Sequence, residues 1–197
     1  MECLLPSVRD GCRLGGVMME SGVGGFQARM GARGGLQWPY GEVLSLLVER
    51  LLERFGSDLV SVVVYGSVAR GEARRDSDVD LLIVLKGMPK GVFKRQELFM
   101  EVEEKLGENL DRLEELGYHV EFSPVIKTPE EARVFSPLYL DMVEDAVILF
   151  DRDGFFDGVL RRLRGRLQEL GAERVRLGKA WYWRLKRDYS FGDVIEI

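Results

Sequence analysis

The decisive stretch of this sequence is Tyr65-Gly-Ser-Val-Ala-Arg-Gly-Glu-Ala-Arg-Arg-Asp-Ser-Asp-Val-Asp-Leu-Leu-Ile-Val-Leu85, in which a polar loop separates two hydrophobic runs. The first run ends at Gly66-Ser67, and the second opens with Asp78 and Asp80. Side chains two residues apart on a strand project from the same side, so both carboxylates should lie next to each other where the second strand begins. The remainder of that strand is apolar and should be buried.

The residue types in this stretch predict a particular chemistry. Two neighbouring carboxylates repel, and each raises the pKa of the other unless a cation lies between them. Carboxylate oxygens that leave room for water and phosphate suit Mg²⁺. The Gly-Ser turn, where a strand gives way to a helix, offers free backbone N–H groups and the positive end of a helix dipole to a phosphate. A phosphate-binding turn that faces a metal-binding carboxylate pair predicts nucleotide chemistry.

Length and composition exclude several other classes of protein. The chain has 197 residues, 46% hydrophobic and 31% charged, as expected for one globular domain with appendages. No apolar run approaches the roughly 18–20 residues of a membrane span, and no signal-peptide pattern is present, so we expect a cytoplasmic protein. Cys3 and Cys12 support neither a disulfide framework nor a zinc site. With His119 as the single histidine, mechanisms that need a histidine pair are excluded.

The chain divides into three predicted segments. Residues 1–37 are glycine-rich, lack hydrophobic periodicity and contain several methionines, which predicts a flexible or over-extended N-terminal segment. Residues 38–152 carry the predicted catalytic domain. Residues 153–197 are predicted to form a basic helix and an aromatic tail packed on that domain.

The hydrophobic pattern predicts helices that alternate with strands around a small mixed sheet. Helices are expected at 41–56, directly after Gly66, at 92–116 with a break at Gly107, at 129–145 and at 154–170. Strands are expected at 59–65, 79–85, 118–123 and 147–150, with a turn between Pro124 and Pro129 and extended pieces in the tail.

Gly66-Ser67, ten further residues and Asp78-x-Asp80, with an apolar run on either side, resemble the signature of the DNA polymerase β-like nucleotidyltransferase superfamily. The chain is most similar to the small, single-domain minimal nucleotidyltransferases of prokaryotes. The resemblance covers residues 40–150. It implies an α/β (α+β) nucleotidyltransferase fold, in which helices flank a small mixed sheet.

Members of this superfamily use three carboxylates, and the resemblance extends that role to three residues of this chain. Asp78 and Asp80 would hold one or two Mg²⁺ ions, and Glu121 would be the third metal-binding and catalytic carboxylate. Glu121 lies on the polar face of the predicted strand 118–123, together with His119 and Ser123. Many family members have aspartate there, and glutamate is longer by one methylene group.

The resemblance also implies which residues bind the nucleotide. Gly66, Ser67 and the adjoining backbone would hold the phosphates of ATP. Three arginines follow on the loop, and their planar guanidinium groups suit phosphate. Arg70 is preferred over Arg74 and Arg75 because of its place in the turn. Ser77 recurs in the family pattern, where it can bind nucleotide or only shape the turn.

Minimal nucleotidyltransferases similar to this chain act as antitoxins of HEPN-type ribonuclease toxins and transfer AMP from ATP to a toxin tyrosine. The resemblance therefore implies ATP and a HEPN-type protein as partners. Between Glu97 and Asp145 the sequence has fourteen acidic and four basic residues, whereas between Arg161 and Arg187 it has ten basic and two acidic residues. Such asymmetry suits a protein partner of complementary charge, and equally a homo-oligomer.

Three alternatives stay open. An enzyme similar to the aminoglycoside nucleotidyltransferases would need an acidic pocket, which the region 97–145 supplies only if its carboxylates leave a solvated helix face. A nucleic-acid-binding module would combine the basic region 161–187 with the aromatic run 181–183. A non-catalytic antitoxin would inhibit by binding alone, although the intact Asp78 and Asp80 argue against it.

Overall fold

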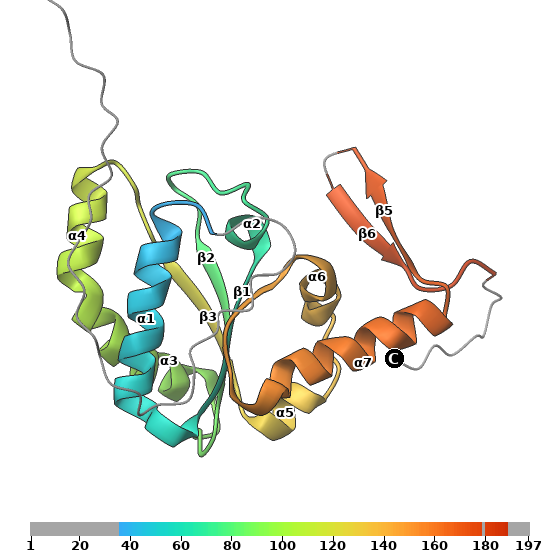
Figure 1. The fold of residues 1–197 in the computed structure, drawn as a ribbon, viewed down its shortest axis with the longest axis horizontal. Helices are drawn as coiled ribbons and strands as arrows, with labels where there is room; N and C mark the ends of the chain where they lie inside the picture. Colours follow the sequence, from blue (N-terminus) through green and yellow to red (C-terminus); the bar gives the residue numbers. More distant parts are fainter. Residues whose placement is uncertain (1–35, 179, 189–197) are drawn as a thin grey trace, which may run out of the picture.

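A computed structural model of the protein describes residues 36–178 and 180–188. Its body is a four-stranded mixed sheet with helices on both faces, and a two-stranded hairpin stands beside it (Figure 1). The strands of the sheet follow the order β3-β2-β1-β4. The predicted α/β class is therefore confirmed. Within the described ranges, no helix is both long and apolar enough to cross a membrane.

Two strands at the centre of the sheet coincide with the predicted ones. The four strands are β1 (Leu59–Tyr65), β2 (Val79–Leu85), β3 (Phe122–Lys127) and β4 (Val147–Asp151). β1 pairs antiparallel with β2 and with β4, and β2 pairs in parallel with β3. In this register Tyr65, the last residue of β1, lies opposite Asp80.

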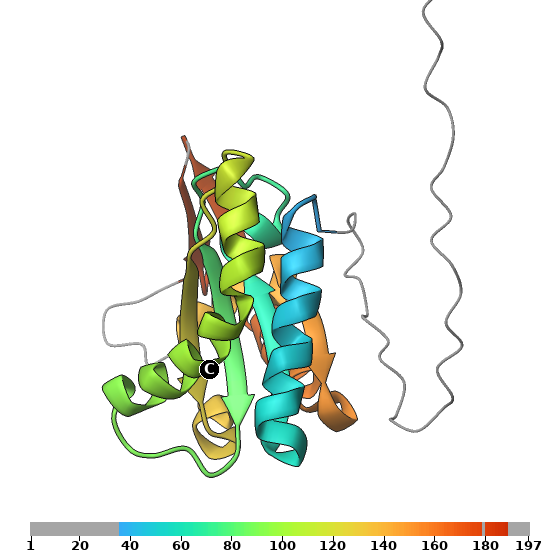
Figure 2. The same ribbon diagram turned by 90° about the vertical axis from the view of Figure 1, so that its left-hand side faces the viewer.

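The helices form two layers. One face of the sheet carries α1 (Tyr40–Phe55), α3 (Val92–Glu103) and α4 (Gly107–Glu115), as Figure 2 shows. The other face carries α5 (Pro129–Arg133), α6 (Leu138–Asp145) and α7 (Phe155–Glu169). The short α2 (Gly66–Ala69) follows β1 directly, and single 3-10 turns occupy Gly56–Asp58, Glu104–Leu106 and Arg152–Gly154. The break that was predicted at Gly107 lies just before it, at the 3-10 turn Glu104–Leu106, and Gly107 begins α4.

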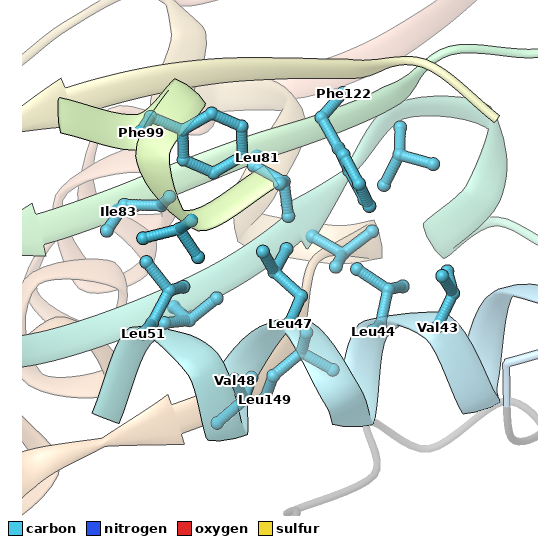
Figure 3. Close-up of a cluster of buried hydrophobic side chains, with 14 of the residues drawn as sticks. Val43, Leu44, Leu47, Val48, Leu51, Leu81, Ile83, Phe99, Phe122 and Leu149 are labelled. Atoms are coloured by element: carbon cyan, nitrogen blue, oxygen red, sulfur yellow. The ribbon is translucent and has the colours of Figure 1, made fainter. Parts of the chain in front are cut away.

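The core lies on both faces of the sheet. Leu81 and Ile83 of β2 are fully buried in the layer of α1 and α3, whereas Leu82 and Val84 are fully buried in the layer of α6 and α7. Figure 3 shows Leu81 facing Leu47 of α1, and Ile83 facing Leu51. A strand that is covered on both faces reads as a continuous apolar run, which is why β2 was predictable to the residue.

The third strand was predicted too early in the chain. β3 begins at Phe122, four residues after the predicted start, and it continues through Pro124, where a turn was predicted. Val79 N–H donates to the carbonyl of Glu121 at 2.8 Å. In this parallel register the backbone groups of residues 121, 123 and 125 point toward β2, whereas those of Pro124 point toward the open edge of the sheet. Proline is tolerated there because an edge position does not require its missing N–H.

Two side chains of α3 cover that open edge. Gln96 Nε2 donates to the carbonyl oxygen of Pro124 at 2.9 Å, and Arg95 Nη1 donates to that of Ile126 at 3.0 Å. Arg95 also forms two hydrogen bonds to Glu131 of α5, at 2.6 and 2.9 Å. The edge carbonyls of Pro124 and Ile126 are therefore satisfied within the molecule.

The helix that was predicted at 129–145 is two helices. Pro137 separates α5 from α6, because proline removes an N–H and disfavours helical geometry in the residue before it. α5 starts with a capping box, in which Thr128 Oγ1 accepts from the Glu131 N–H and Glu131 accepts from the Thr128 N–H.

The C-terminal region forms a hairpin after α7, with strands β5 (Glu173–Leu177) and β6 (Ala180–Arg184). The apolar side of α7, including Phe156 and Leu160, is buried in the same layer as α6. The domain boundary at 152 stays a prediction. The predicted N-terminal segment 1–37 lies outside the described residues except for 36–37, and so do the last nine residues of the tail.

Candidate active site

Gly66 is in direct contact with Asp80. The glycine opens α2 with φ of +74°, a backbone conformation that other residues rarely adopt. A Cβ atom built on Gly66 would lie 2.1 Å from Asp80 Oδ2, so the carboxylate occupies the space that any side chain would need. The pairing of β1 with β2 creates this contact, because it sets Asp80 opposite Tyr65. The Gly-Ser turn and the second carboxylate therefore form one site.

The two aspartates of the site differ in environment. Asp78 is exposed just before β2, and Asp80 is half-buried within the strand. Burial raises the pKa of Asp80, the negative charge of Asp78 raises it further, and the positive charge of Arg70 lowers it. The repulsion that the sequence predicted is therefore present, and a cation between the carboxylates would relieve it.

A divalent hard cation fits this pair of oxygen donors. Among residues 36–178 and 180–188, no group of three or more His, Cys, Asp and Glu side chains is close enough to hold a metal ion. Two carboxylates with the remaining positions left to water and phosphate are the ligand set that Mg²⁺ commonly takes in nucleotide enzymes. Asp78 and Asp80 would therefore hold Mg²⁺ together with the substrate rather than as a closed protein site.

Glu121 reaches the site with its backbone. Its carbonyl accepts the N–H of Val79 and so fixes the start of β2. Its side chain is exposed, and its charge acts on Glu103 of α3, whose pKa is raised first by burial and then by Glu121. The structure brings Asp78 and Asp80 together and leaves the Glu121 carboxylate outside their group. A third carboxylate at this position remains a prediction.

The other polar residues of the predicted strand 118–123 separate. Ser123 lies beside Asp80 in the parallel pairing of β2 with β3. His119 lies before β3, and its Nδ1 is 3.9 Å from the exposed Glu114 carboxylate of α4. Of these residues, Ser123 is the one that the sheet brings next to Asp80. In the sequence, this position was indicated only by its alternation with Glu121, which places both side chains on one face of a strand.

Tyr65 also belongs to the surroundings of Asp80. Burial, followed by the charge of Asp80, raises its pKa to about 12. The hydroxyl therefore stays protonated at neutral pH and can donate a hydrogen bond. Sequence reasoning treated this tyrosine only as the end of a strand, because the residue opposite it depends on the register of β1 with β2.

The first turn of α2 carries residues that were predicted to contact phosphate. The N–H groups of Gly66, Ser67 and Val68 have no acceptor within a helix that begins at Gly66. Ser67 is half-buried. Arg70 ends the helix, its Nε donates to Glu72 Oε2 at 2.8 Å, and its charge acts on Asp80.

Ser77 and Arg75, two residues of the loop before β2, have partners that give them a structural role. Ser77 Oγ accepts from the Arg74 N–H at 2.9 Å, and the Ser77 N–H donates to the Arg74 carbonyl at 3.2 Å. The Arg75 guanidinium lies 5.1 Å from the centre of the Tyr118 ring. Ser77 therefore shapes the turn before Asp78. Among the three loop arginines, Arg70 is the one whose charge lowers the pKa of Asp80.

The chain resembles known proteins over the part that builds this site. The family model for a nucleotidyltransferase domain matches residues 44–152, more than half of the chain. A protein of Methanocaldococcus jannaschii named "Putative protein adenylyltransferase" is 31% identical over 124 residues, which are 62% of this chain and 79% of the relative.

Two solved structures show more distant likenesses. A toxin–antitoxin complex with AMP-PNP contains a chain with a TM-score of 0.41 and 19% identity, matched over 64% of this chain and 90% of that chain. The complex of a tri-AMPylated HEPN toxin of Shewanella oneidensis with its MNT antitoxin gives a TM-score of 0.33 and 14% identity, over 66% and 87%. Because both TM-scores are below 0.5, neither likeness carries an argument about this chain.

Proposed function

Because this chain belongs to the nucleotidyltransferase domain family, over residues 44–152, we propose that it is a metal-dependent enzyme that transfers AMP from ATP to a hydroxyl group of a partner protein. Nucleotidyl transfer is the activity of the family. Support for an adenylyl group and a protein acceptor comes from the relative that is named a protein adenylyltransferase and of which this chain covers 79%.

The observation that carries the proposal is the contact of Asp80 with Gly66. Asp80 Oδ2 lies 2.1 Å from the position that a Cβ atom of Gly66 would take, so a metal held by Asp80 would be next to the first turn of α2. Triphosphate oxygens need both kinds of partner at once. A divalent cation and oriented N–H groups at one point therefore support the binding of a nucleoside triphosphate.

Each residue has a role in this reaction. Mg²⁺, when bound, would neutralise phosphate charge and lower the pKa of the acceptor hydroxyl. Asp78 and Asp80 would hold it, the first turn of α2 with Ser67 would hold the β- and γ-phosphates, and Arg70 would add a positive charge beside them. The developing charge falls on phosphate oxygens, so fixed cations and N–H donors are effective.

In the proposed transfer, one bond to the α-phosphorus forms and one breaks. The acceptor oxygen bonds to the α-phosphorus, while the bond from that phosphorus to the bridging oxygen breaks and pyrophosphate leaves with the electron pair. The proton of the acceptor hydroxyl passes to a carboxylate, for which Glu121 is the proposed residue. A rotation of its exposed side chain toward Asp78 would be required, since its charge acts on Glu103 in this structure.

We further propose that the acceptor is a tyrosine of a HEPN-type ribonuclease toxin, to which this chain is the antitoxin. The spacing of Gly66-Ser67 and Asp78-x-Asp80, which resembles that of antitoxin nucleotidyltransferases, supports this acceptor. A nucleic-acid acceptor has less support. Arg174 binds two carboxylates at the end of α6, and Arg184 and Arg187 both bind Glu173, so part of the basic region is paired within the chain.

The test is transfer of label from α-labelled ATP, with Mg²⁺, to the protein encoded by the neighbouring gene. We expect one or more labelled tyrosines, and no label with the Asp78→Asn/Asp80→Asn double variant, which should still fold. Tight binding of the partner without label would replace catalysis by sequestration. Label that persists with the double variant would show that the carboxylates are assigned wrongly.

Glu121→Gln tests the third carboxylate in the same assay. Loss of rate by far more than an ordinary surface substitution produces would support its role in proton transfer. A rate near that of the wild type would move the third carboxylate to another residue, and Ser123→Ala then asks whether the neighbour of Asp80 takes part.

A further inference from the structure

The loop between α2 and β2, residues 70–78, is supported from outside by two other parts of the chain. It connects the Gly-Ser turn to Asp78, so its shape decides where the exposed Asp78 carboxylate lies relative to Asp80. One support comes from the start of α1 and the other from the turn between α4 and β3. Both supports are residues distant in sequence from the loop.

The first support is Tyr40, the first residue of α1. Its hydroxyl donates a hydrogen bond to the carbonyl of Arg74 at 2.5 Å, and its side chain is buried. The same carbonyl accepts the N–H of Ser77, whose hydroxyl in turn accepts the N–H of Arg74. Tyr40 therefore fixes the one peptide group that closes the turn immediately before Asp78.

The second support is a stack of three side chains. The Arg75 guanidinium lies over the Tyr118 ring at 5.1 Å, and the Trp38 ring meets Tyr118 edge-to-face at a centroid distance of 5.1 Å. The backbone adds a hydrogen bond of 2.7 Å, from the N–H of His119 to the carbonyl of Arg75. The carbonyl groups of Arg74 and Arg75 are thus each held by a residue from outside the loop.

We propose that Tyr40 and the Arg75–Tyr118 stack are positioning residues of the nucleotidyltransferase site, which hold the 70–78 loop so that Asp78 stays beside Asp80. The start of α1 and the turn after α4 thereby become parts of the site. The meaning of this role rests on the proposed function, because it matters to the reaction only if the aspartate pair binds the metal with the nucleotide.

Physical chemistry explains why such supports are needed. Asp78 precedes β2 and is exposed, so the sheet does not hold it. The negative charge of Asp80 repels it when no cation is bound, and a free loop would move the two carboxylates apart. A metal would then have to reorder the loop on binding, and the lost conformational freedom would weaken binding. Anchored residues 74 and 75 keep the pair in place beforehand.

The test measures the binding of Mn²⁺ in the absence of nucleotide, and the electron paramagnetic resonance signal of the free ion reports how much is bound. Hydrogen exchange of the backbone amides of residues 70–78 is measured in parallel. Tyr40→Phe removes one hydrogen bond and keeps the buried ring. We expect Mn²⁺ to bind about threefold to tenfold more weakly, as the loss of one hydrogen bond implies. The amides of the loop should exchange faster, and other amides should not.

Tyr139→Phe is the matched control. Tyr139 is as buried as Tyr40, and among the described residues its hydroxyl has no hydrogen-bond partner. Its loss should change neither Mn²⁺ binding nor the exchange of the loop. Tyr118→Phe keeps the ring that supports Arg75 and should behave like the wild type, whereas Tyr118→Ser should behave like Tyr40→Phe.

Arg75→Leu separates positioning from electrostatics by the sign of its effect. Removal of a positive charge near the carboxylates should strengthen Mn²⁺ binding if Arg75 acts only through its charge, and should weaken it if Arg75 holds the loop. Stronger or unchanged binding would overturn the positioning role, as would a Tyr40→Phe variant with normal Mn²⁺ binding and normal exchange. These measurements need no acceptor, so they stand if the wild type transfers no AMP.

Discussion

At the scale of single residues, Gly66 joins backbone conformation to the chemistry of the site. Its φ of +74° lets the chain turn from β1 into α2, and its missing side chain leaves room for the Asp80 carboxylate. Gly87 also has a positive φ, of +66°, but a Cβ built on it would meet nothing within 4 Å. The two glycines therefore separate the requirement for conformation from the requirement for space.

Gly66→Ala should abolish AMP transfer, whereas Gly87→Ala should leave it intact. In both variants the strain of alanine at positive φ should lower the unfolding free energy by about 1 kcal/mol. Gly66→Ala should lower it further, because its new methyl group also displaces the Asp80 carboxylate. Chemical denaturation and the transfer assay measure the two effects. An active Gly66→Ala enzyme would show that the Asp80 carboxylate is free to move aside.

Asp80 is costly to the fold when no metal is bound. Its pKa is raised in the folded state by burial and by Asp78, so the folded protein holds the proton more tightly than the unfolded chain. Stability therefore falls as the pH rises from the ordinary aspartate pKa through the raised one. A carboxylate kept against this cost is expected where function needs it.

Asp80→Asn should therefore stabilise the metal-free protein at pH 7, by about 0.5–2 kcal/mol, while it abolishes transfer. Mg²⁺ should raise the melting temperature of the wild type and leave that of the variant unchanged, because a ligand stabilises only a state that binds it. Asp141→Asn, at an exposed position of α6, is the control and should change neither quantity. An Asp80→Asn protein that is less stable than the wild type would contradict the expected cost of the buried carboxylate.

The site residues that sequence analysis identified are those whose geometry is local. Asp78 and Asp80 are two residues apart on one strand, and Gly66 ends the strand before it, so alternation and a turn sufficed. Tyr40 and Tyr118 were beyond this reasoning, and so was the direction of the Glu121 side chain, whose role as third carboxylate stays a prediction. Their positions depend on how α1, the turn after α4 and β3 pack against the loop, and no periodicity encodes that packing.

At the scale of elements, burial on both sides decided what could be predicted. β1 and β2 lie at the centre of the sheet, and their apolar runs match the strands residue for residue. β3 lies at the edge, and its apolar residues are interrupted by Pro124 and polar side chains, so the alternating segment before it was mistaken for the strand. The break before α6 was missed although Pro137 marks it in the sequence.

The link between α3 and α5 depends on the ionised form of Glu131. Two hydrogen bonds to Arg95 are the main cause of its low pKa of about 2, and the N–H of Thr128 adds to the effect. A carboxylate whose pKa is lowered by folding stabilises the protein above its ordinary pKa. This contribution is lost as the pH falls from about 4.5 toward about 2.

Glu131→Gln should lower the unfolding free energy at pH 7 by about 1 kcal/mol, a figure reduced because the Glu131 side chain is 47% exposed. The difference between the variant and the wild type should shrink as the pH falls from about 4.5 toward about 2, because the unfolded wild type takes up a proton at Glu131 before the folded protein does. Denaturation at several pH values measures it. Glu97→Gln, at an exposed position of α3, should show no such pH dependence.

At the scale of the whole molecule, the acidic and basic regions of the sequence meet within the chain. Arg174 of β5 is only 11% exposed, and it pairs with Asp145 at 2.5 Å and with Glu144 at 3.3 Å. Its guanidinium also lies 4.8 Å from the centre of the Trp181 ring. A two-stranded hairpin is marginal by itself, so these contacts hold β5 and β6 beside the body of the protein.

Arg174→Ala should loosen the hairpin without abolishing the site. We expect faster hydrogen exchange across β5 and β6, and a loss of about 1–3 kcal/mol because Asp145 is left without its closest partner. Arg176→Ala is the control, since Arg176 is exposed and bonds only within the hairpin turn and the Trp181 face. Unchanged exchange in Arg174→Ala would mean that other contacts dock the hairpin.

The edge of β3 has a consequence for the behaviour of the protein in concentrated solution. An uncovered edge strand offers a row of carbonyl groups to which a strand of another molecule can add, and repeated addition gives aggregates. Gln96 and Arg95 already occupy the outward carbonyls of Pro124 and Ile126, and Pro124 itself has no N–H to offer. The side chains that complete β3 therefore also protect the solubility of the molecule, and substitutions at Arg95 or Gln96 risk precipitation before they affect transfer.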